Sequence, residues 1–328
     1  MLSLSILALS SPVPTMVETS AVSEWEAWKA DHGKLYSSHA EHDLRQRIWM
    51  QTREEILVHN AKGASWTAGF NAFSDLSWEE FKAEKLMAPQ NCSATHTASG
   101  DWKVKGMELP DSIDWRDTIE KTAPWPVKNQ GHCGSCWTFS TVGAMESHYI
   151  IKHAAAKNLS EQQLVDCAGA FNNFGCNGGL PSQAFEYLHY AGGHDTEDVY
   201  PYTAVDGKCA FDGKGEAQVR AVNNITAFDE MELQEAVGTK GPVSIAYQVS
   251  SDFRNYKEGV YDGVCDDQPM DVNHAVVAVG YGSMKPGGKY WTVRNSWGDT
   301  FGVDGYFKIA RGKNKCGLSD CASFPSVA

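Results

Sequence analysis

The chain has 328 residues, 42% of them hydrophobic, and this length suffices for a catalytic domain with an additional segment. Its formal net charge of −13 at pH 7 argues against nucleic acid as a partner, because phosphate binding requires clustered Lys and Arg. The sequence contains no run of about 18 apolar residues, so we expect neither a transmembrane helix nor a membrane partner.

Residues 1–17 begin with a short apolar stretch that ends at Leu9. The length of this stretch is typical of a secretory signal peptide, but no basic residue precedes Lys29, so a frayed N-terminus is the alternative. The chain also has nine cysteines, a number that suggests folding in an oxidising compartment. We therefore expect residues 1–17 to be a signal peptide.

Residues 23–60 are predicted to be helical. Between Glu41 and Asn60, one set of residues recurs at the spacing of a single helix face. The set consists of Glu41, Arg45, Ile48, Trp49, Thr52, Ile56 and Asn60. Taken alone, this pattern indicates an amphipathic helix.

The next segments are a short motif and a polar stretch. Gly69, Asn71, Phe73 and Asp75 occupy alternate positions. Residues 96–108 are polar, contain glycine and show no periodicity, which predicts a linker open to cleavage.

The remainder changes character along its length. A helix with buried apolar positions is predicted from Ser135 to about His153, and Ser160 is placed to cap a further helix. After residue 218 the pattern becomes short strands between Gly and Pro turns, at residues 243–245, 275–279, 290–293 and 306–309. Helices first and strands later predict an α+β enzyme with a cleft between its halves.

The chemistry-bearing motif is Cys133-Gly-Ser-Cys136-Trp. A C-x-x-C pair can be a redox site or half of a zinc site. Downstream, His274 lies in Asn-His-Ala-Val and Asn295 lies in Asn-Ser-Trp-Gly. A cysteine, a distant histidine and a distant asparagine are the parts of a nucleophile, its base and the group that orients the base.

Together these residues resemble the papain-like cysteine peptidases, whose signature is C-G-[SA]-C-[WY] with a downstream His and Asn. The helix-face set resembles the E-R-F-N-I-N pattern of the prosegments of that family, with Trp49 where Phe is usual and Thr52 where Asn is usual. Residues 69–75 resemble their G-x-N-x-F-x-D element. The resemblance extends from about residue 23 to residue 328. It implies a two-lobed peptidase, with a helical lobe and a β-barrel-like lobe, that is preceded by a helical inhibitory prodomain.

The resemblance also implies a mechanism. Cys136 would be a thiolate, stabilised by the N-terminal end of its helix and by protonated His274. The thiolate would attack a peptide carbonyl, His274 would protonate the leaving amine, and water would hydrolyse the thioester. Asn295 would orient the imidazole.

Further residues have roles that the resemblance implies. Gln130 would stabilise the oxyanion together with the main-chain N–H of Cys136. Trp297 would cover the bond between histidine and asparagine, and Gly179 would pair with the substrate main chain. His132, beside the nucleophile, is expected to be a surface residue.

Eight cysteines besides Cys136 permit 105 pairings, so connectivity does not follow from the sequence. The resemblance implies three pairs. They are Cys133 with Cys176, Cys167 with Cys209, and Cys265 with Cys316. Cys92 and Cys321 remain.

The segment from Pro89 to Thr95 resembles the mini-chain of the cathepsin H branch, a propeptide remnant held by a disulfide, although Ala88 stands where Glu is usual. Cys321 is at the position of the partner cysteine. In that branch the remnant fills the non-primed cleft, and its terminal carboxylate selects a free substrate N-terminus. The resemblance thus implies an aminopeptidase with some endopeptidase activity, in which Thr95 and Cys321 join Gly179 and Trp297 as substrate-binding residues.

The expected organisation is a prodomain at 18–87, a mini-chain at 88–95, an excised linker at 96–108 and a peptidase domain at 109–328. Expected partners are peptide and protein substrates, the chain's own prodomain and, by family, cystatin-type inhibitors. We expect no cofactor and no metal, and a lysosomal or secreted location. The glycosylation sequons are at Asn91, Asn158 and Asn224, and Asn158 has the alternative role of a helix N-cap.

Three alternatives remain open. A cathepsin L-like endopeptidase would use the same residues without retaining a mini-chain. A disulfide oxidoreductase would use Cys133 and Cys136 and would not need His274. An inactive homologue would act as a binding protein, but every required catalytic residue is present.

Overall fold

The computed structural model describes residues 16–328 except 91, 93–101, 103–105, 107 and 266–271. The first fifteen residues, most of the expected signal peptide, lie outside this range. Among the described residues, no helix is both long and apolar enough to cross a bilayer.

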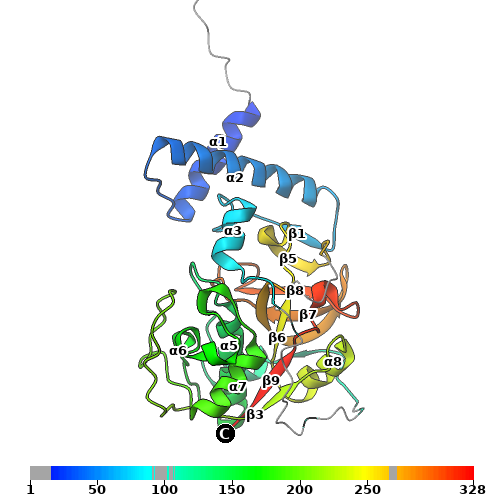
Figure 1. The fold of residues 1–328 in the computed structure, drawn as a ribbon. Helices are drawn as coiled ribbons and strands as arrows, with labels where there is room; N and C mark the ends of the chain where they lie inside the picture. The colour runs from blue at the N-terminus through cyan, green and yellow to red at the C-terminus, as the bar shows by residue number, and fades with distance from the viewer. Residues whose placement is uncertain (1–15, 91, 93–101, 103–105, 107, 266–271) are drawn as a thin grey trace, which may run out of the picture.

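The N-terminal part is a helical unit that contacts the rest of the molecule through its later elements (Figure 1). Its elements are α1 (Met16–Asp31), α2 (His39–Asn60), β1 (Trp66–Ala68) and α3 (Trp78–Lys85). Trp25, Trp28 and Trp49 form a small buried cluster between α1 and α2. Trp49, which stands where the prosegment pattern usually has Phe, is thus a core residue of this unit.

The helices of the catalytic part cluster early in the chain, as predicted. They are α4 (Arg116–Thr122), α5 (Cys136–His153), α6 (Glu161–Cys167), α7 (Pro181–Ala191) and, later, α8 (Glu230–Thr239). Most of α5 is buried, because α7, β6 and β9 pack around it. The central position of α5 fixes the location of its first residue.

The strands form a nine-stranded sheet with the order β1-β5-β8-β7-β6-β4-β9-β3, and β2 pairs with β6. The catalytic part supplies β2 (Ile113–Asp114), β3 (Val219–Asn224), β4 (Val243–Tyr247), β5 (Tyr256–Tyr261), β6 (His274–Met284), β7 (Gly288–Arg294), β8 (Tyr306–Ala310) and β9 (Ser323–Val327). Helices followed by strands confirm the α+β prediction.

The edge strand of this sheet comes from the N-terminal unit. β1 pairs antiparallel with β5, with Trp66 opposite Gly259. Main-chain pairing of this kind satisfies an otherwise open sheet edge. The N-terminal unit is therefore docked by backbone hydrogen bonds as well as by side chains.

Candidate active site

Cys136 is the first residue of α5 and is completely buried. Its Sγ accepts a hydrogen bond of 3.4 Å from the main-chain N–H of Ala275. Among the described cysteines it is the free one. A free thiol at a helix N-terminus has the position expected of a nucleophile.

His274 is the first residue of β6, and Asn295 follows the end of β7. Antiparallel pairing of these strands places Val277 opposite Arg294, which brings the two site residues together although they are far apart in sequence. Nε2 of His274 lies 2.8 Å from Oδ1 of Asn295. The indole of Trp297 stacks on the imidazole, with ring centroids 4.6 Å apart. The imidazole is therefore held in one orientation and shielded from water.

Two hydrogen bonds to the side-chain oxygen of Gln130 fix the orientation of its amide group. Oε1 accepts hydrogen bonds from Ser296 Oγ at 2.8 Å and from Trp297 Nε1 at 3.1 Å. The amide nitrogen must then face the cleft, where it donates to the carbonyls of Cys133 at 2.9 Å and Lys85 at 3.0 Å. Lys85 belongs to the N-terminal unit, so a carbonyl of that unit occupies the donor expected to serve the oxyanion.

The chain that follows α3 runs through the cleft. The main-chain N–H of Met87 donates to Asn273 O at 2.9 Å, and that of Ala88 donates to Asn177 O at 3.1 Å. The N–H of Gln90 donates to Val272 O at 3.1 Å. This segment therefore binds as an extended peptide across the site.

Gly178 permits this close approach. It has φ of +124°, and a Cβ there would lie 2.8 Å from Cβ of Met87. A Cβ at Gly179 would instead meet the enzyme's own Trp137 at 2.8 Å. The described contacts of the cleft segment thus involve Gly178, whereas the resemblance had indicated Gly179. The two glycines are adjacent in the sequence, and this pair was the feature that could have pointed to Gly178.

Burial determines the charge state of the site in this form. Burial raises the pKa of Cys136 to about 12 and lowers the pKa of His274 to about 4. Nδ1 of His274 finds no hydrogen-bond partner in the described part of the chain. In this closed form desolvation favours a neutral thiol and a neutral imidazole. The thiolate–imidazolium pair stays a prediction for the enzyme without its propeptide.

Four disulfides join the remaining cysteines. The pairs are Cys92–Cys321, Cys133–Cys176, Cys167–Cys209 and Cys265–Cys316. Because Cys133 is bonded to Cys176, the C-x-x-C pair is not a redox dithiol. The bond from Cys92 ties the cleft segment to the catalytic part, with Cα atoms 5.1 Å apart.

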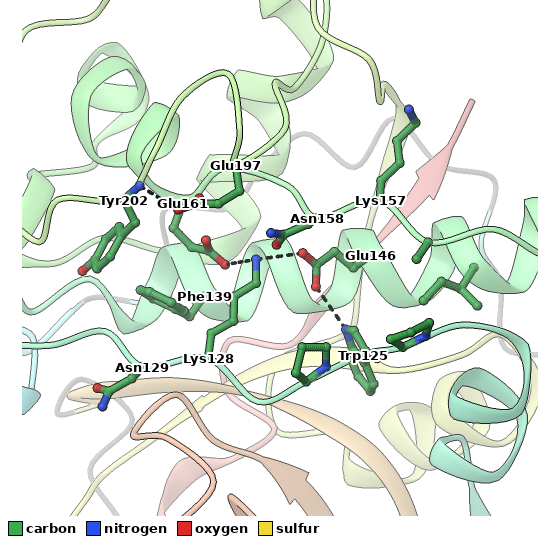
Figure 2. A pocket seen from close by; sticks show the side chains of 14 residues that line it. Trp125, Lys128, Asn129, Phe139, Glu146, Lys157, Asn158, Glu161, Glu197 and Tyr202 are labelled. Atoms are coloured by element: carbon green, nitrogen blue, oxygen red, sulfur yellow. Dashed lines mark hydrogen bonds and ion pairs between the residues drawn. The ribbon is translucent and has the colours of Figure 1, made fainter.

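A half-buried lysine, Lys128, joins α5 to the loop that carries Gln130 (Figure 2). Nζ of Lys128 lies 2.8 Å from carboxylate oxygens of both Glu146 and Glu161, at one side of a cavity of about 600 Å³. Burial raises the pKa of Glu161 to about 7. Sequence reasoning missed this cluster, which fixes the base of the Gln130 loop through charge-assisted bonds.

The other predicted residues are dispersed. His132 is exposed, and its Nδ1 lies 2.9 Å from a carboxylate oxygen of Glu84. Asn158 is exposed, but Ser160 caps α6, so the N-cap alternative for Asn158 is wrong. Asn224 is half-buried at the end of β3.

Two expected site residues, Asn91 and Thr95, lie outside the described residues. Among the residues that are described, no group of three His, Cys, Asp or Glu side chains could hold a metal ion.

Comparisons with known proteins agree with this arrangement. Residues 109–326 match the papain family cysteine protease, and residues 25–81 match the cathepsin propeptide inhibitor domain. Cysteine proteinase 2 of Zea mays is 52% identical over 300 residues, covering 90% of this chain and 82% of that protein. Pro-cathepsin H of Bos taurus is 49% identical over 304 residues, covering 92% of this chain and 89% of that protein.

A solved structure shows the same arrangement of propeptide and enzyme. The digestive procathepsin L2 proteinase of Tenebrio molitor superposes with a TM-score of 0.85 at 38% identity, covering 93% of this chain and 99% of that one. The chain therefore belongs to the papain family of cysteine peptidases and is a zymogen with a cathepsin-type propeptide.

Proposed function

We propose that Cys136 is the nucleophile of this peptidase and that His274 is its acid and base. Once the propeptide leaves, water reaches both groups and the desolvation that keeps them neutral is relieved. The thiol proton then passes to Nδ1 of His274, which has no hydrogen-bond partner among the described residues. The sulfur attacks the peptide carbonyl, and Nδ1 returns the proton to the leaving amine.

Two residues complete the proposed mechanism. Asn295 holds Nε2 of His274, so Nδ1 is the nitrogen available for proton transfer. The amide nitrogen of Gln130 donates to the oxyanion at the place where it now donates to Lys85 O. Water then attacks the thioester, with His274 as base, and releases the acid product.

The mature enzyme acts mainly as an aminopeptidase in this proposal. The observation that carries it is the disulfide between Cys92 and Cys321. Cleavage on both sides of residues 88–95 would leave this segment attached, and the bond from Gln90 N–H to Val272 O would keep it beside the cleft. A retained segment blocks long substrates, and its terminal carboxylate, at Thr95, attracts a free α-amino group.

A paired substrate assay tests this specificity. Acid-matured enzyme is given an aminoacyl substrate with a free amine and the same substrate with the amine blocked. We expect hydrolysis of the free amine to exceed that of the blocked form at least tenfold. Equal hydrolysis would leave a cysteine peptidase without aminopeptidase specificity.

The second candidate is a cathepsin L-like endopeptidase. It is favoured by the likeness to the digestive procathepsin L2 structure. In that case Cys92 would leave with the propeptide, and cleavage inside long peptides would dominate. The same assay separates the two candidates.

The proposed setting is the lysosome or the extracellular space. Four disulfides favour an oxidising route of synthesis. Exposed Asn158 would be open to a glycan, whereas half-buried Asn224 is less accessible. A mass shift on glycosidase treatment of the secreted chain tests this setting, and cystatin-type inhibitors are the expected family partners.

A further inference from the structure

The hydroxyl of Tyr202 joins two parts of the active site. Its Oη donates a hydrogen bond of 2.8 Å to the main-chain carbonyl of Gln130 and lies 2.6 Å from Oγ of Ser135. Ser135 immediately precedes Cys136, and Gln130 carries the amide that we assign to the oxyanion. The contact contains no propeptide residue, so it does not depend on the propeptide being docked.

The direction of these hydrogen bonds follows from their acceptors. A carbonyl oxygen cannot donate, so the hydroxyl proton of Tyr202 goes to the carbonyl of Gln130. Ser135 must then donate to Oη of Tyr202, because its alternative acceptor, the carbonyl of Cys133, is 3.5 Å away. The result is a directed chain of hydrogen bonds from Ser135 through Tyr202 to Gln130, and bonds in such chains strengthen one another.

Ser135 contributes to this chain instead of capping its own helix. It is the N-cap of α5, where a serine side chain usually accepts from a main-chain N–H, but its side chain makes no such bond. The hydroxyl instead links the start of α5 to Tyr202. The next residue is Cys136, whose N–H is the second donor expected for the oxyanion. Tyr202 therefore contacts both chain segments that supply oxyanion donors.

Tyr202 is itself anchored at its backbone and at its ring (Figure 2). Its main-chain N–H donates to Oε1 of Glu197 at 2.8 Å, and the N–H of Thr203 donates to Oε1 of Gln162 on α6 at 2.9 Å. The ring packs edge-on against Phe139 of α5, with centroids 5.0 Å apart. These contacts hold the hydroxyl of Tyr202 in one place.

Gln130 is held from two directions. The segment that follows β7 bonds its N–H and its side-chain oxygen through Ser296 and Trp297. Tyr202 bonds its main-chain carbonyl. The hydroxyl of Tyr202 is thus the contact through which the helical part of the molecule fixes the main chain of Gln130.

We propose that Tyr202 is a positioning residue for catalysis, which holds the main chain of Gln130 so that the amide nitrogen meets the oxyanion. This inference rests on the oxyanion role proposed above for Gln130. Oxyanion donors act mainly on the transition state, and a small misplacement of a catalytic group lowers the rate. Loss of the hydroxyl should therefore reduce kcat and leave KM nearly unchanged.

The test compares Tyr202→Phe, which removes only the hydroxyl, with the matched control Tyr200→Phe. Tyr200 lies in the same segment, but its hydroxyl donates to Asp166 of α6, at 2.8 Å. All chains are matured in acid with added pepsin, so that maturation does not depend on the activity of each variant. We expect kcat of Tyr202→Phe on a short substrate to fall about fivefold to twentyfold, with KM changed by about twofold or less. Tyr200→Phe should keep both values.

Two further measurements separate positioning from general damage to the site. Alkylation of Cys136 by iodoacetamide forms no oxyanion, so Tyr202→Phe should leave its rate unchanged. In a chain that already carries Gln130→Ala, Tyr202→Phe should lower kcat by about twofold or less, because the amide that it positions is absent.

Three results would overturn the inference while Gln130 keeps its role. They are an unchanged kcat in Tyr202→Phe, an equal loss of kcat with and without Gln130→Ala, and alkylation of Cys136 that slows in proportion to kcat. The single variant Gln130→Ala distinguishes failure of the proposed oxyanion role. If that variant alone leaves kcat unchanged, the role of Gln130 is wrong and the inference about Tyr202 is wrong with it.

Discussion

The side-chain amide of Gln130 donates a 3.0 Å hydrogen bond to the main-chain carbonyl of Lys85. A propeptide carbonyl therefore occupies the donor that we assign to the oxyanion of the substrate. The flanking residue Met87 is bonded to Asn273 O in the same cleft. The propeptide thus occupies groups that we assign to substrate binding, and the chain is held in place by β1, by Lys85 and by the disulfide of Cys92.

Loss of the Gln130 amide should reduce catalysis. For Gln130→Ala we expect kcat of the mature enzyme to fall about 10²–10³-fold with little change in KM, because the donor acts mainly on the transition state. Steady-state kinetics on a short substrate measure this effect. An unchanged kcat would remove Gln130 from the mechanism.

The two cysteines of the C-x-x-C motif should behave differently. Cys136→Ser should abolish hydrolysis while the thermal stability of the zymogen is kept. Cys133→Ser should instead lower the free energy of unfolding by about 2–5 kcal/mol, because it breaks the bond to Cys176. Measuring thermal unfolding and activity for both variants allows a direct comparison of the two cysteines. A stable but inactive Cys133→Ser would contradict our choice of nucleophile.

The reactivity of Cys136 should depend on the propeptide. In the zymogen, burial raises the pKa of its thiol, so we expect slow alkylation by iodoacetamide between pH 6 and 8. In the mature enzyme, renewed contact with water and with protonated His274 should lower this pKa, and alkylation should be at least a hundredfold faster at pH 6. Equal rates in both forms would show that the propeptide does not control the thiol.

Three buried histidines should limit the stability of the zymogen in acid. Burial lowers the pKa values of His148, His194 and His274 to about 4. Unfolded chains bind these protons near pH 6.5, so the contribution of these histidines to the free energy of unfolding should decrease as the pH falls from about 6.5 to about 4 and then level off. Glu161, whose pKa is raised by burial, contributes with the opposite sign. Each histidine contributes about 3 kcal/mol to this loss.

Urea unfolding of the Cys136→Ser chain at several pH values measures that dependence. His148→Gln should make it shallower, because the neutral amide retains a donor for Pro242 O without titrating. The exposed residue His132 is the matched control, and His132→Gln should leave the slope unchanged. A slope that is the same in all three proteins would contradict the assignment to His148.

Sequence motifs predicted the parts of the site that are coded locally or by a family pattern. The helix that starts at Cys136 and the strand that starts at His274 follow from their apolar spacing, and α2 follows from the periodicity that includes Trp49 and Thr52. The meeting of His274 with Asn295 was implied by resemblance and depends on the register of β6 and β7. Such a register is a tertiary property that no single segment contains.

Other features depend on burial, which sequence patterns do not give. The raised pKa of Cys136 and the lowered pKa of His274 arise from burial in the folded zymogen. Lys128 meets Glu146 and Glu161 only because α5 and α6 pack against the loop that carries Lys128.

Non-reducing mass spectrometry of the acid-matured enzyme tests the aminopeptidase proposal most directly. We expect a peptide that contains Cys92 and ends near Thr95 to be bonded to Cys321, and to separate from the enzyme only after reduction. Cys92→Ser should lack this peptide and should cleave longer peptides internally at an increased rate, with Cys136 still reactive. If Cys92 is lost with the propeptide, or if its substitution leaves the ratio of aminopeptidase to endopeptidase activity unchanged, the retained segment does not determine specificity.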